Sequence, residues 1–262
     1  MMFTIQIIIS FFVGGILIAL QTLIGERVSL RWRGIILTIP TTTAIGLFFI
    51  GIAKSPIDAA NAALYIPASA GASYTFVTIF TLLRNKGLVL SYFFALIFWG
   101  LFASLIITFP PSTFTNSILI FLVIPVIIGY LTVKSLPQIP DLKKFPMNFR
   151  HLFFRSLLGG FIIALGVFLS KTLVNIWGGI FTTFPAVFSS SLIIYYYLQG
   201  AKVIPSVSKS MFFPGAVGFP LYVIVVNITF PIYGIWLGTL LAYLAYTAFL
   251  LFWDFMKKVL FS

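Results

Sequence analysis

Long runs of apolar residues, separated by short polar segments, dominate the pattern along the chain. A helix needs about 20 residues to cross the apolar core of a bilayer, whereas outer-membrane strands show weaker alternating patterns of about ten residues. The runs here have helical length. They predict about nine transmembrane helices, at Phe3–Ile24, Ile35–Ile52, Ile57–Leu83, Leu88–Ile107, Ser117–Val133, Leu157–Leu173, Trp177–Leu198, Val203–Thr229 and Ile232–Phe252.

The composition also indicates a membrane protein. Hydrophobic residues make up 61% of the chain and charged residues 8%, and the mean hydropathy is +1.15. These values leave too few polar side chains to coat a water-soluble globule. The sequence therefore predicts an all-α membrane protein with no soluble domain of any size. Cysteine is absent, which excludes disulfides and thiolate metal sites.

The positive residues predict an orientation, because Lys and Arg in short loops are retained on the cytoplasmic side. With the N-terminus outside and the C-terminus in the cytoplasm, fourteen of the sixteen Lys and Arg residues fall in cytoplasmic positions, and only Lys54 and Lys171 fall outside. The net charge of +12 is thus distributed loop by loop rather than in one basic patch, so nucleic acid is not an expected partner. We expect a multi-pass protein of the cytoplasmic (inner) membrane of a prokaryote.

An internal repeat is visible when the sequence is shifted by 145 positions. Gly14-Gly15 then aligns with Gly159-Gly160, Gly34-Ile35 with Gly179-Ile180, and Pro40 with Pro185. The predicted organisation is a four-helix repeat at 1–110, a linking helix and cytoplasmic loop at 111–150, and a second four-helix repeat at 151–262. Four helices plus one linking helix is an odd number, so the second repeat is inverted relative to the first. Inverted repeats with a central site are typical of secondary transporters.

Prolines within the predicted helices indicate where such a site would lie. A proline removes a backbone donor and disturbs the preceding turn, and irregular backbone at membrane depth is tolerated only against protein or water. Hydroxyl side chains surround both aligned prolines. The candidate substrate-binding residues at these two breaks are Thr38, Pro40, Thr42, Thr183, Pro185 and Ser190. The alternative is that the hydroxyls only satisfy the kinked backbone.

The third and eighth predicted helices add two candidates, Asn61 and Lys209. Both helices contain a proline, Pro67 and Pro214, and we expect the third helix to break at Pro67. Lys209 lies about two turns inside the predicted cytoplasmic end, where an ammonium group must pair, face water or extend to the interface. Its functional role would be to bind an anion. Asp58 is expected to stabilise the N-terminus of its helix.

Signatures of catalysis are missing from the sequence. It contains no HExxH, no G-x-S-x-G, no phosphate-binding glycine loop and one histidine, so we expect no enzyme, no cofactor and no metal site. The expected partners are the lipid bilayer and a small polar or anionic solute. Assembly into a homo-oligomer is left open.

The segment Gly178-Gly179-Ile180-Phe181-Thr182-Thr183-Phe184-Pro185-Ala186, after a helix with Gly159-Gly160, resembles small uncharacterised four-helix prokaryotic membrane proteins with a Gly-Gly…Pro pattern. The resemblance implies that each half of the chain is one such unit. It implies no substrate.

The sequence therefore favours a secondary transporter or facilitator of a small polar or anionic solute, working by alternating access at a midplane site. Two alternatives are a non-transporting assembly or interaction subunit, whose small-residue helices would bind a partner, and a lipid flippase, which would open laterally to the bilayer.

Overall fold

The computed structural model describes residues 2–28, 36, 39–138, 149–173 and 175–260, and these residues form helices and short connections without a strand. Seven of the helices are long and apolar enough to cross a membrane. Many large apolar side chains are exposed along them, as expected where the surrounding solvent is lipid. The predicted class, a helical membrane-embedded protein, agrees with these findings.

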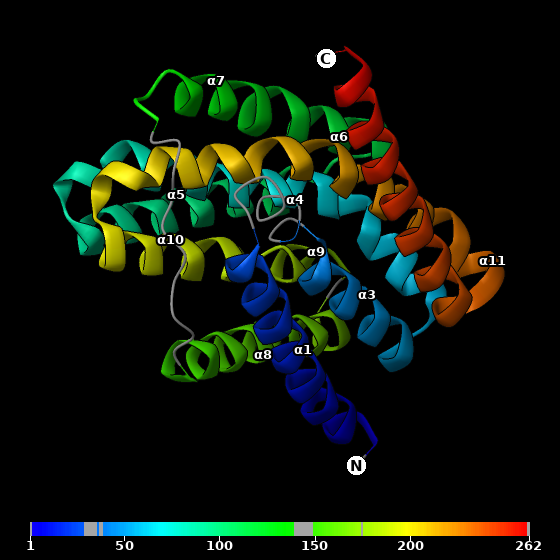
Figure 1. Ribbon diagram of the computed structural model, residues 1–262. Coiled ribbons are helices and arrows are strands. Elements are labelled where there is room, and N and C mark those ends of the chain that lie inside the picture. Colours follow the sequence, from blue (N-terminus) through cyan, green and yellow to red (C-terminus); the bar gives the residue numbers. More distant parts are fainter. Residues whose placement is uncertain (1, 29–35, 37–38, 139–148, 174, 261–262) are drawn as a thin grey trace.

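The helices follow one another closely along the chain (Figure 1). Three-residue 3₁₀ turns, η1 (Arg84–Lys86) and η3 (Ala201–Val203), connect two pairs of them, and the short π-helix η2 (Leu122–Ile128) joins α6 to α7. The α-helices are α1 (Met2–Arg27), α3 (Thr41–Ala53), α4 (Pro56–Leu83), α5 (Leu88–Thr108), α6 (Phe114–Phe121), α7 (Gly129–Lys134), α8 (Phe149–Thr172), α9 (Asn175–Thr182), α10 (Ala186–Gln199) and α11 (Ile204–Leu260).

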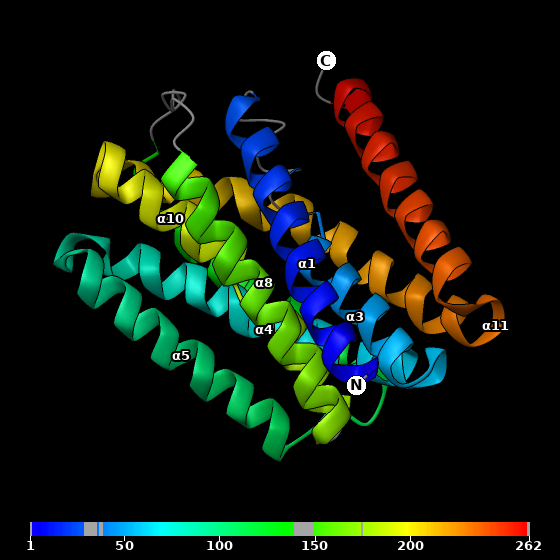
Figure 2. The ribbon, with the colours of Figure 1, turned by 90° about the horizontal axis from the view of Figure 1, so that it is seen from below.

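The regular helices differ from the predicted spans where Pro40 and Pro185 interrupt them. In the predicted span Ile35–Ile52, the regular helix α3 begins only at Thr41 and has 13 residues. The predicted span Trp177–Leu198 is likewise divided between α9 and α10. The last two predicted spans correspond to the two arms of α11, two helices that meet at a kink at Gly234, where φ is 75°. A positive φ favours glycine, which has no Cβ. The bend turns the chain back on itself, so that the second arm of α11 and α5 stand at opposite edges of the bundle (Figure 2).

Helix α4 forms the centre of the core and contacts α3, α5, α6, α9 and α11. The first arm of α11 runs antiparallel to it. Near one end, the hydroxyls of Thr81 and Ser208 lie 2.7 Å apart, and near the other end Asn227 donates a hydrogen bond to the Ala60 carbonyl at 2.8 Å. Small residues such as Ala59, Ala62 and Ala63 are fully buried on α4, which allows neighbouring backbones to approach closely.

Helices α1 and α8 cross in contact with each other (Figure 1), and the glycine pairs noticed in the sequence lie at this contact. A Cβ added to Gly15 would collide with the backbone of Ser156, and one added to Gly160 would collide with the backbone of Phe11. Positions that rise along α1 meet positions that fall along α8, so the two helices are antiparallel. The missing side chains let them pack backbone against backbone.

The expected break at Pro67 is wrong, because α4 continues through this residue. Proline removes a donor within the helix, and the local hydrogen bonding is rearranged around it. The Ala68 amide donates to the Ser117 hydroxyl of α6 at 3.0 Å, and the Ser69 hydroxyl donates to the Tyr65 carbonyl at 2.6 Å. α11 likewise continues through Pro214.

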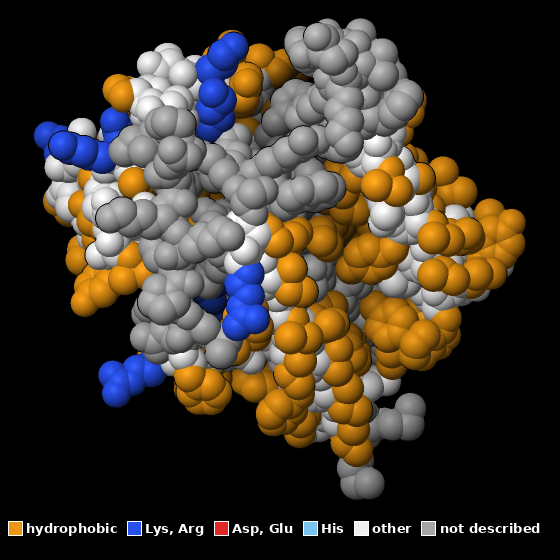
Figure 3. Space-filling view, viewed as in Figure 1, with side chains coloured by type: hydrophobic (Ala, Val, Ile, Leu, Met, Phe, Trp, Pro, Cys, Tyr) orange, Lys and Arg blue, Asp and Glu red, His pale blue; other side chains and the backbone are white. Residues whose placement is uncertain are grey.

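The two lysines assigned to the outside lie at one end of the bundle. The Lys171 ammonium donates to the Ala53 carbonyl at 2.6 Å, next to the ion pair of Lys54 with Asp58 at 3.5 Å. Asp58 lies in the first turn of α4, as expected. The residue that caps the helix is Ser55, whose hydroxyl accepts a hydrogen bond from the Asp58 amide. On the face drawn in Figure 3, Lys and Arg side chains lie in the left half of the view, and hydrophobic side chains cover much of the right and lower parts.

Candidate functional site

Two proline breaks, 145 positions apart, have the same backbone geometry. Pro40 precedes α3 with φ −75° and ψ 50°, and Pro185 precedes α10 with φ −76° and ψ 47°. The hydrogen bonds around them also match. The bonds Ile39 N to Ile36 O, Thr41 N to Ile39 O and Ala44 N to Pro40 O measure 3.2, 2.7 and 2.7 Å, and the bonds Phe184 N to Phe181 O, Ala186 N to Phe184 O and Ser189 N to Pro185 O have the same three lengths.

Different side chains serve the carbonyl groups at the two breaks. At the first break, the Gln21 amide of α1 donates to the carbonyls of Ile36 and Ile39, at 2.8 and 2.9 Å. Gln21 is buried, so these two bonds replace the intrahelical bonds that the break removes. The position that corresponds to Gln21 in the second half is Gly166, which has no side chain to offer.

At the second break, hydroxyl groups take this role. Thr182 donates to the Gly179 carbonyl and Thr183 to the Ile180 carbonyl, both at 2.8 Å. Two further hydroxyls reach across from other helices: Ser73 of α4 donates to the Thr183 carbonyl, and Thr43 of α3 donates to the Thr182 carbonyl at 3.4 Å. The break is thus held by residues from three elements.

A cavity of about 60 Å³ lies between the two breaks. This volume is enough for a few water molecules. The elements that line it are the two breaks with the starts of α3 and α10, together with α4 and α11. The lining residues are Ile39, Pro40, Thr42, Thr43, Ala70, Ser73, Tyr74, Thr183, Phe184, Pro185, Val187, Phe188 and Phe219.

Eight lining residues form four pairs separated by 145 positions, so each break contributes the same four positions. The first break presents two hydroxyls where the second presents apolar side chains. The pairs are Ile39 with Phe184, Pro40 with Pro185, Thr42 with Val187, and Thr43 with Phe188. The two walls of the cavity therefore have equivalent backbones but differ in polarity.

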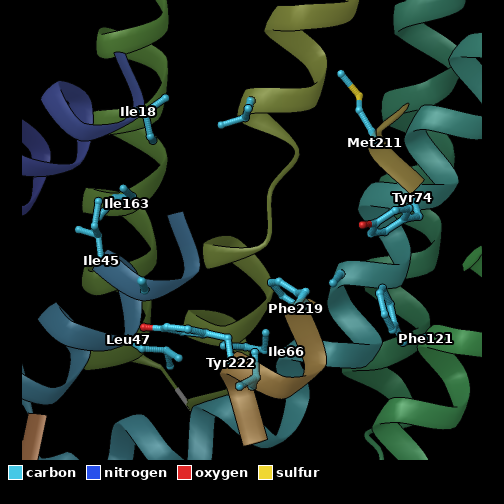
Figure 4. Packing of buried hydrophobic residues seen from close by; sticks show 14 of the residues in the cluster. Ile18, Ile45, Leu47, Ile66, Tyr74, Phe121, Ile163, Met211, Phe219 and Tyr222 are labelled. Carbon is cyan, nitrogen blue, oxygen red and sulfur yellow. The ribbon is translucent and has the colours of Figure 1, made fainter. Parts of the chain in front are cut away.

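Aromatic rings close one side of the cavity. Tyr74 is 3% exposed and makes edge contacts with Phe121, Phe188 and Phe212, with ring centroids 5.2 to 5.6 Å apart. Figure 4 shows its hydroxyl directed toward the side on which Phe219 lies. None of the described lining residues is Asp, Glu, Lys, Arg or His. The site therefore offers hydroxyls and carbonyl groups rather than charge.

The structure brings four of the predicted site residues together, because Pro40, Thr42, Thr183 and Pro185 all line this cavity. Ser190 is one turn further along α10 and lines a different pocket, beside Arg155.

Two other candidates lie away from the cavity, and a third cannot be placed. Asn61 is exposed on α4, and it is Asn227 of α11 that bonds to the neighbouring Ala60. Lys209 is half-buried on α11, next to the Ser208 hydroxyl that meets Thr81. Thr38 lies outside the described residues.

The sequence reasoning missed Gln21, Thr43, Ser73 and Tyr74. A buried glutamine in the middle of an apolar helix is a recognisable signal, because its amide needs partners, and Gln21 could have been found on this ground. Ser73 and Tyr74 gave no such signal. They resemble ordinary small-residue and aromatic packing positions until the fold places them beside the break.

The fold and the apolar helices define the class of a helical membrane protein. Comparison with known families adds that residues 152–262 are similar to a family described as a protein of unknown function, DUF3147. The match runs from α8 to the end of the chain and leaves out the first half. No curated protein and no solved structure matches the chain.

Proposed function

We propose that the protein is a secondary transporter or facilitator of a small polar solute, which binds in the cavity between the two proline breaks. The observation that carries the proposal is the equivalent contribution of the two breaks to one cavity. A site built from two equivalent walls, each of which can move against the rest, can be opened to either side of the membrane in turn.

The proposal includes an inverted duplication of four helices around a linking segment, α6 to α7. It is supported by the matching hydrogen bonds at the breaks, by the reciprocal glycine contacts between the antiparallel α1 and α8, and by the positive φ of both Gly87 and Gly234 before α5 and the second arm of α11. The family match over residues 152–262 also coincides with the proposed second repeat.

The chemistry of the cavity favours a neutral polar solute over an anion. Hydroxyls of Thr42, Thr43 and Ser73 line it, and hydroxyl groups can both donate and accept hydrogen bonds. An anionic solute remains the alternative, and it would need Lys209 to move toward the cavity from its half-buried position on α11.

Screening small metabolites for stabilisation of the purified protein tests the proposal. At least one small polar compound is expected to raise the melting temperature of the parent. The Thr42→Val variant, which removes one cavity hydroxyl, should reduce that shift, whereas the same change at Thr108, an exposed threonine on α5, should not. Uptake of the compound into proteoliposomes then separates transport from binding. A compound that binds at the cavity and is never taken up would favour an interaction subunit instead.

The inverted arrangement has its own test, because it requires the ends of the linking segment to lie on opposite sides of the membrane. Ser112 and Ser135 are exposed at the two ends of α6 to α7. With no native cysteine in the chain, single cysteines can be probed with an impermeant thiol reagent. A cysteine at Ser112 is expected to react from outside and one at Ser135 only after permeabilisation. Labelling of both from the same side would contradict the inverted duplication.

A further inference from the structure

A second pocket, of about 280 Å³, lies between α5, α8 and α10. Its walls are largely apolar and include Leu88, Phe154 and Leu158, while Ser190 and Tyr197 add hydroxyl groups. The remaining polar member is Arg155, which is only 4% exposed. The pocket therefore combines a buried cation with surfaces suited to hydrocarbon.

The pocket lies near the ends of its three helices. Leu88 is the first residue of α5 and is separated from the basic turn η1 only by Gly87. Tyr197 is in the last turn of α10, shortly before Lys202. Arg155 lies less than two turns from the start of α8. Basic residues and tyrosines at helix ends are typical of the headgroup region of a membrane, so the pocket extends from that region toward the apolar interior.

Arg155 makes the pocket suitable for an anionic group. A guanidinium stays charged under all ordinary conditions and presents five donors in a planar fork that matches a phosphate group. These donors are enough to serve a partner within the protein and a bound anion at the same time. Basic pockets between transmembrane helices are suited to anionic lipid headgroups.

The first half contains a comparable groove that lacks the charge. Ile9, Val13, Ile45 and Ile52 line a groove of about 530 Å³ against α11, and they correspond, 145 positions earlier, to Phe154, Leu158, Ser190 and Tyr197. The position that corresponds to Arg155 is Ser10, whose hydroxyl bonds to the Ile7 carbonyl of its own helix. The chain thus provides an uncharged counterpart for comparison.

We infer that the pocket at Arg155 binds an anionic phospholipid, with the phosphate group at the guanidinium and an acyl chain along the apolar wall. The groove at Ile9 and Val13 accepts acyl chains without preference for a charged headgroup. The inference does not depend on transport through the central cavity.

Lipid binding to the purified full chain tests this inference, by native mass spectrometry and by the melting temperature. Phosphatidylglycerol is expected to bind and stabilise the parent more than phosphatidylcholine does. Arg155→Gln should weaken phosphatidylglycerol binding by about tenfold or more, because the charge-assisted bonds are lost, while Arg155→Lys retains part of it. Arg150→Gln, an exposed position on the same helix, should bind like the parent.

A second variant keeps the test decisive if Arg155→Gln does not fold. Leu158→Trp fills the pocket without changing charge and should abolish the preference for phosphatidylglycerol, whereas Val13→Trp at the corresponding position should leave it unchanged. Equal binding of the two lipids by the parent, or retained preference in Leu158→Trp, would overturn the inference. Equal stabilisation by inorganic phosphate alone would also overturn it, because the site would then be a simple anion site.

Discussion

The two proline breaks share a backbone and differ in the side chains that support it. Around Pro40 and Pro185 the same hydrogen bonds recur with the same lengths, yet the first break relies on the amide of Gln21 and the second on threonine and serine hydroxyls. The comparison shows that the same backbone shape can be supported by different side-chain hydrogen bonds. What differs is polarity: the first break presents Thr42 and Thr43 to the cavity where the second presents Val187 and Phe188.

The largest expected effect comes from the crossing of α1 and α8, which holds the two halves together. Gly15→Leu and Gly160→Leu should each lower stability by about 1–3 kcal/mol or more, because the new side chains would collide with backbone atoms that cannot easily move. Gly100→Leu, at a position with open space around it, is the matched control. Thermal unfolding in detergent measures all three. Equal tolerance of Gly15→Leu and Gly100→Leu would show that the crossing is not closely packed.

The next effect separates the two breaks. Gln21→Met keeps a side chain of similar length but removes one hydrogen bond from each of the carbonyls of Ile36 and Ile39, which then keep only their backbone donors. The loss of these two bonds should cost about 1–3 kcal/mol. Gly166→Ala at the corresponding position should change stability by about 0.5 kcal/mol or less, since its Cβ would lie at ordinary contact distance, 3.5 Å from the nearest atom. A stable Gln21→Met protein would mean that the first break does not depend on this side chain.

Exchange of side chains between the cavity walls should affect binding more than stability. Thr42→Val makes the first wall resemble the second, and Val187→Thr does the reverse. Because the side chains have nearly the same shape, and Thr42 is only partly buried, we expect Thr42→Val to change stability by about 1 kcal/mol or less. Stabilisation by the bound solute should fall in Thr42→Val and be partly restored in the double variant. Unchanged solute binding in Thr42→Val would place the solute elsewhere.

The smallest effect is expected at Lys209, which is half-buried and does not line the cavity. Lys209→Met removes the charge and keeps most of the stem, while Lys209→Arg keeps the charge. For a neutral solute, both variants should bind like the parent in the same stabilisation assay. A loss of binding in Lys209→Met that Lys209→Arg restores would favour an anionic solute and a closer approach of this residue.

The sequence was most informative where the physics is local. The length of the apolar runs predicts the helices, and Pro40 and Pro185 predict the breaks, because a proline acts on its own backbone. Pro67 shows the limit of this reasoning. The helix continues through it, and the neighbouring Ala68 amide has the Ser117 hydroxyl as its partner, a contact between residues far apart in the chain that no local pattern reveals.

Only part of the candidate site could be predicted from the sequence, namely the residues that lie next to the prolines. Thr42 and Thr183 stand next to the prolines in sequence, and they line the cavity. Ser190 points to another pocket, and Ser73 and Tyr74 reach the cavity from α4, because those positions depend on how helices cross. Arg155 gives no local signal in the sequence, and only the packing of α8 into the fold buries it.

Access to the cavity from both sides of the membrane tests the central claim most directly. A single cysteine at Thr42, in proteoliposomes of known orientation, is exposed to a small impermeant thiol reagent from either side in turn. The account predicts reaction from both sides, slowed by a solute that stabilises the protein, and no reaction at a lipid-facing control such as Leu105→Cys. Reaction from one side only, or from neither, would contradict a site that opens alternately to the two sides.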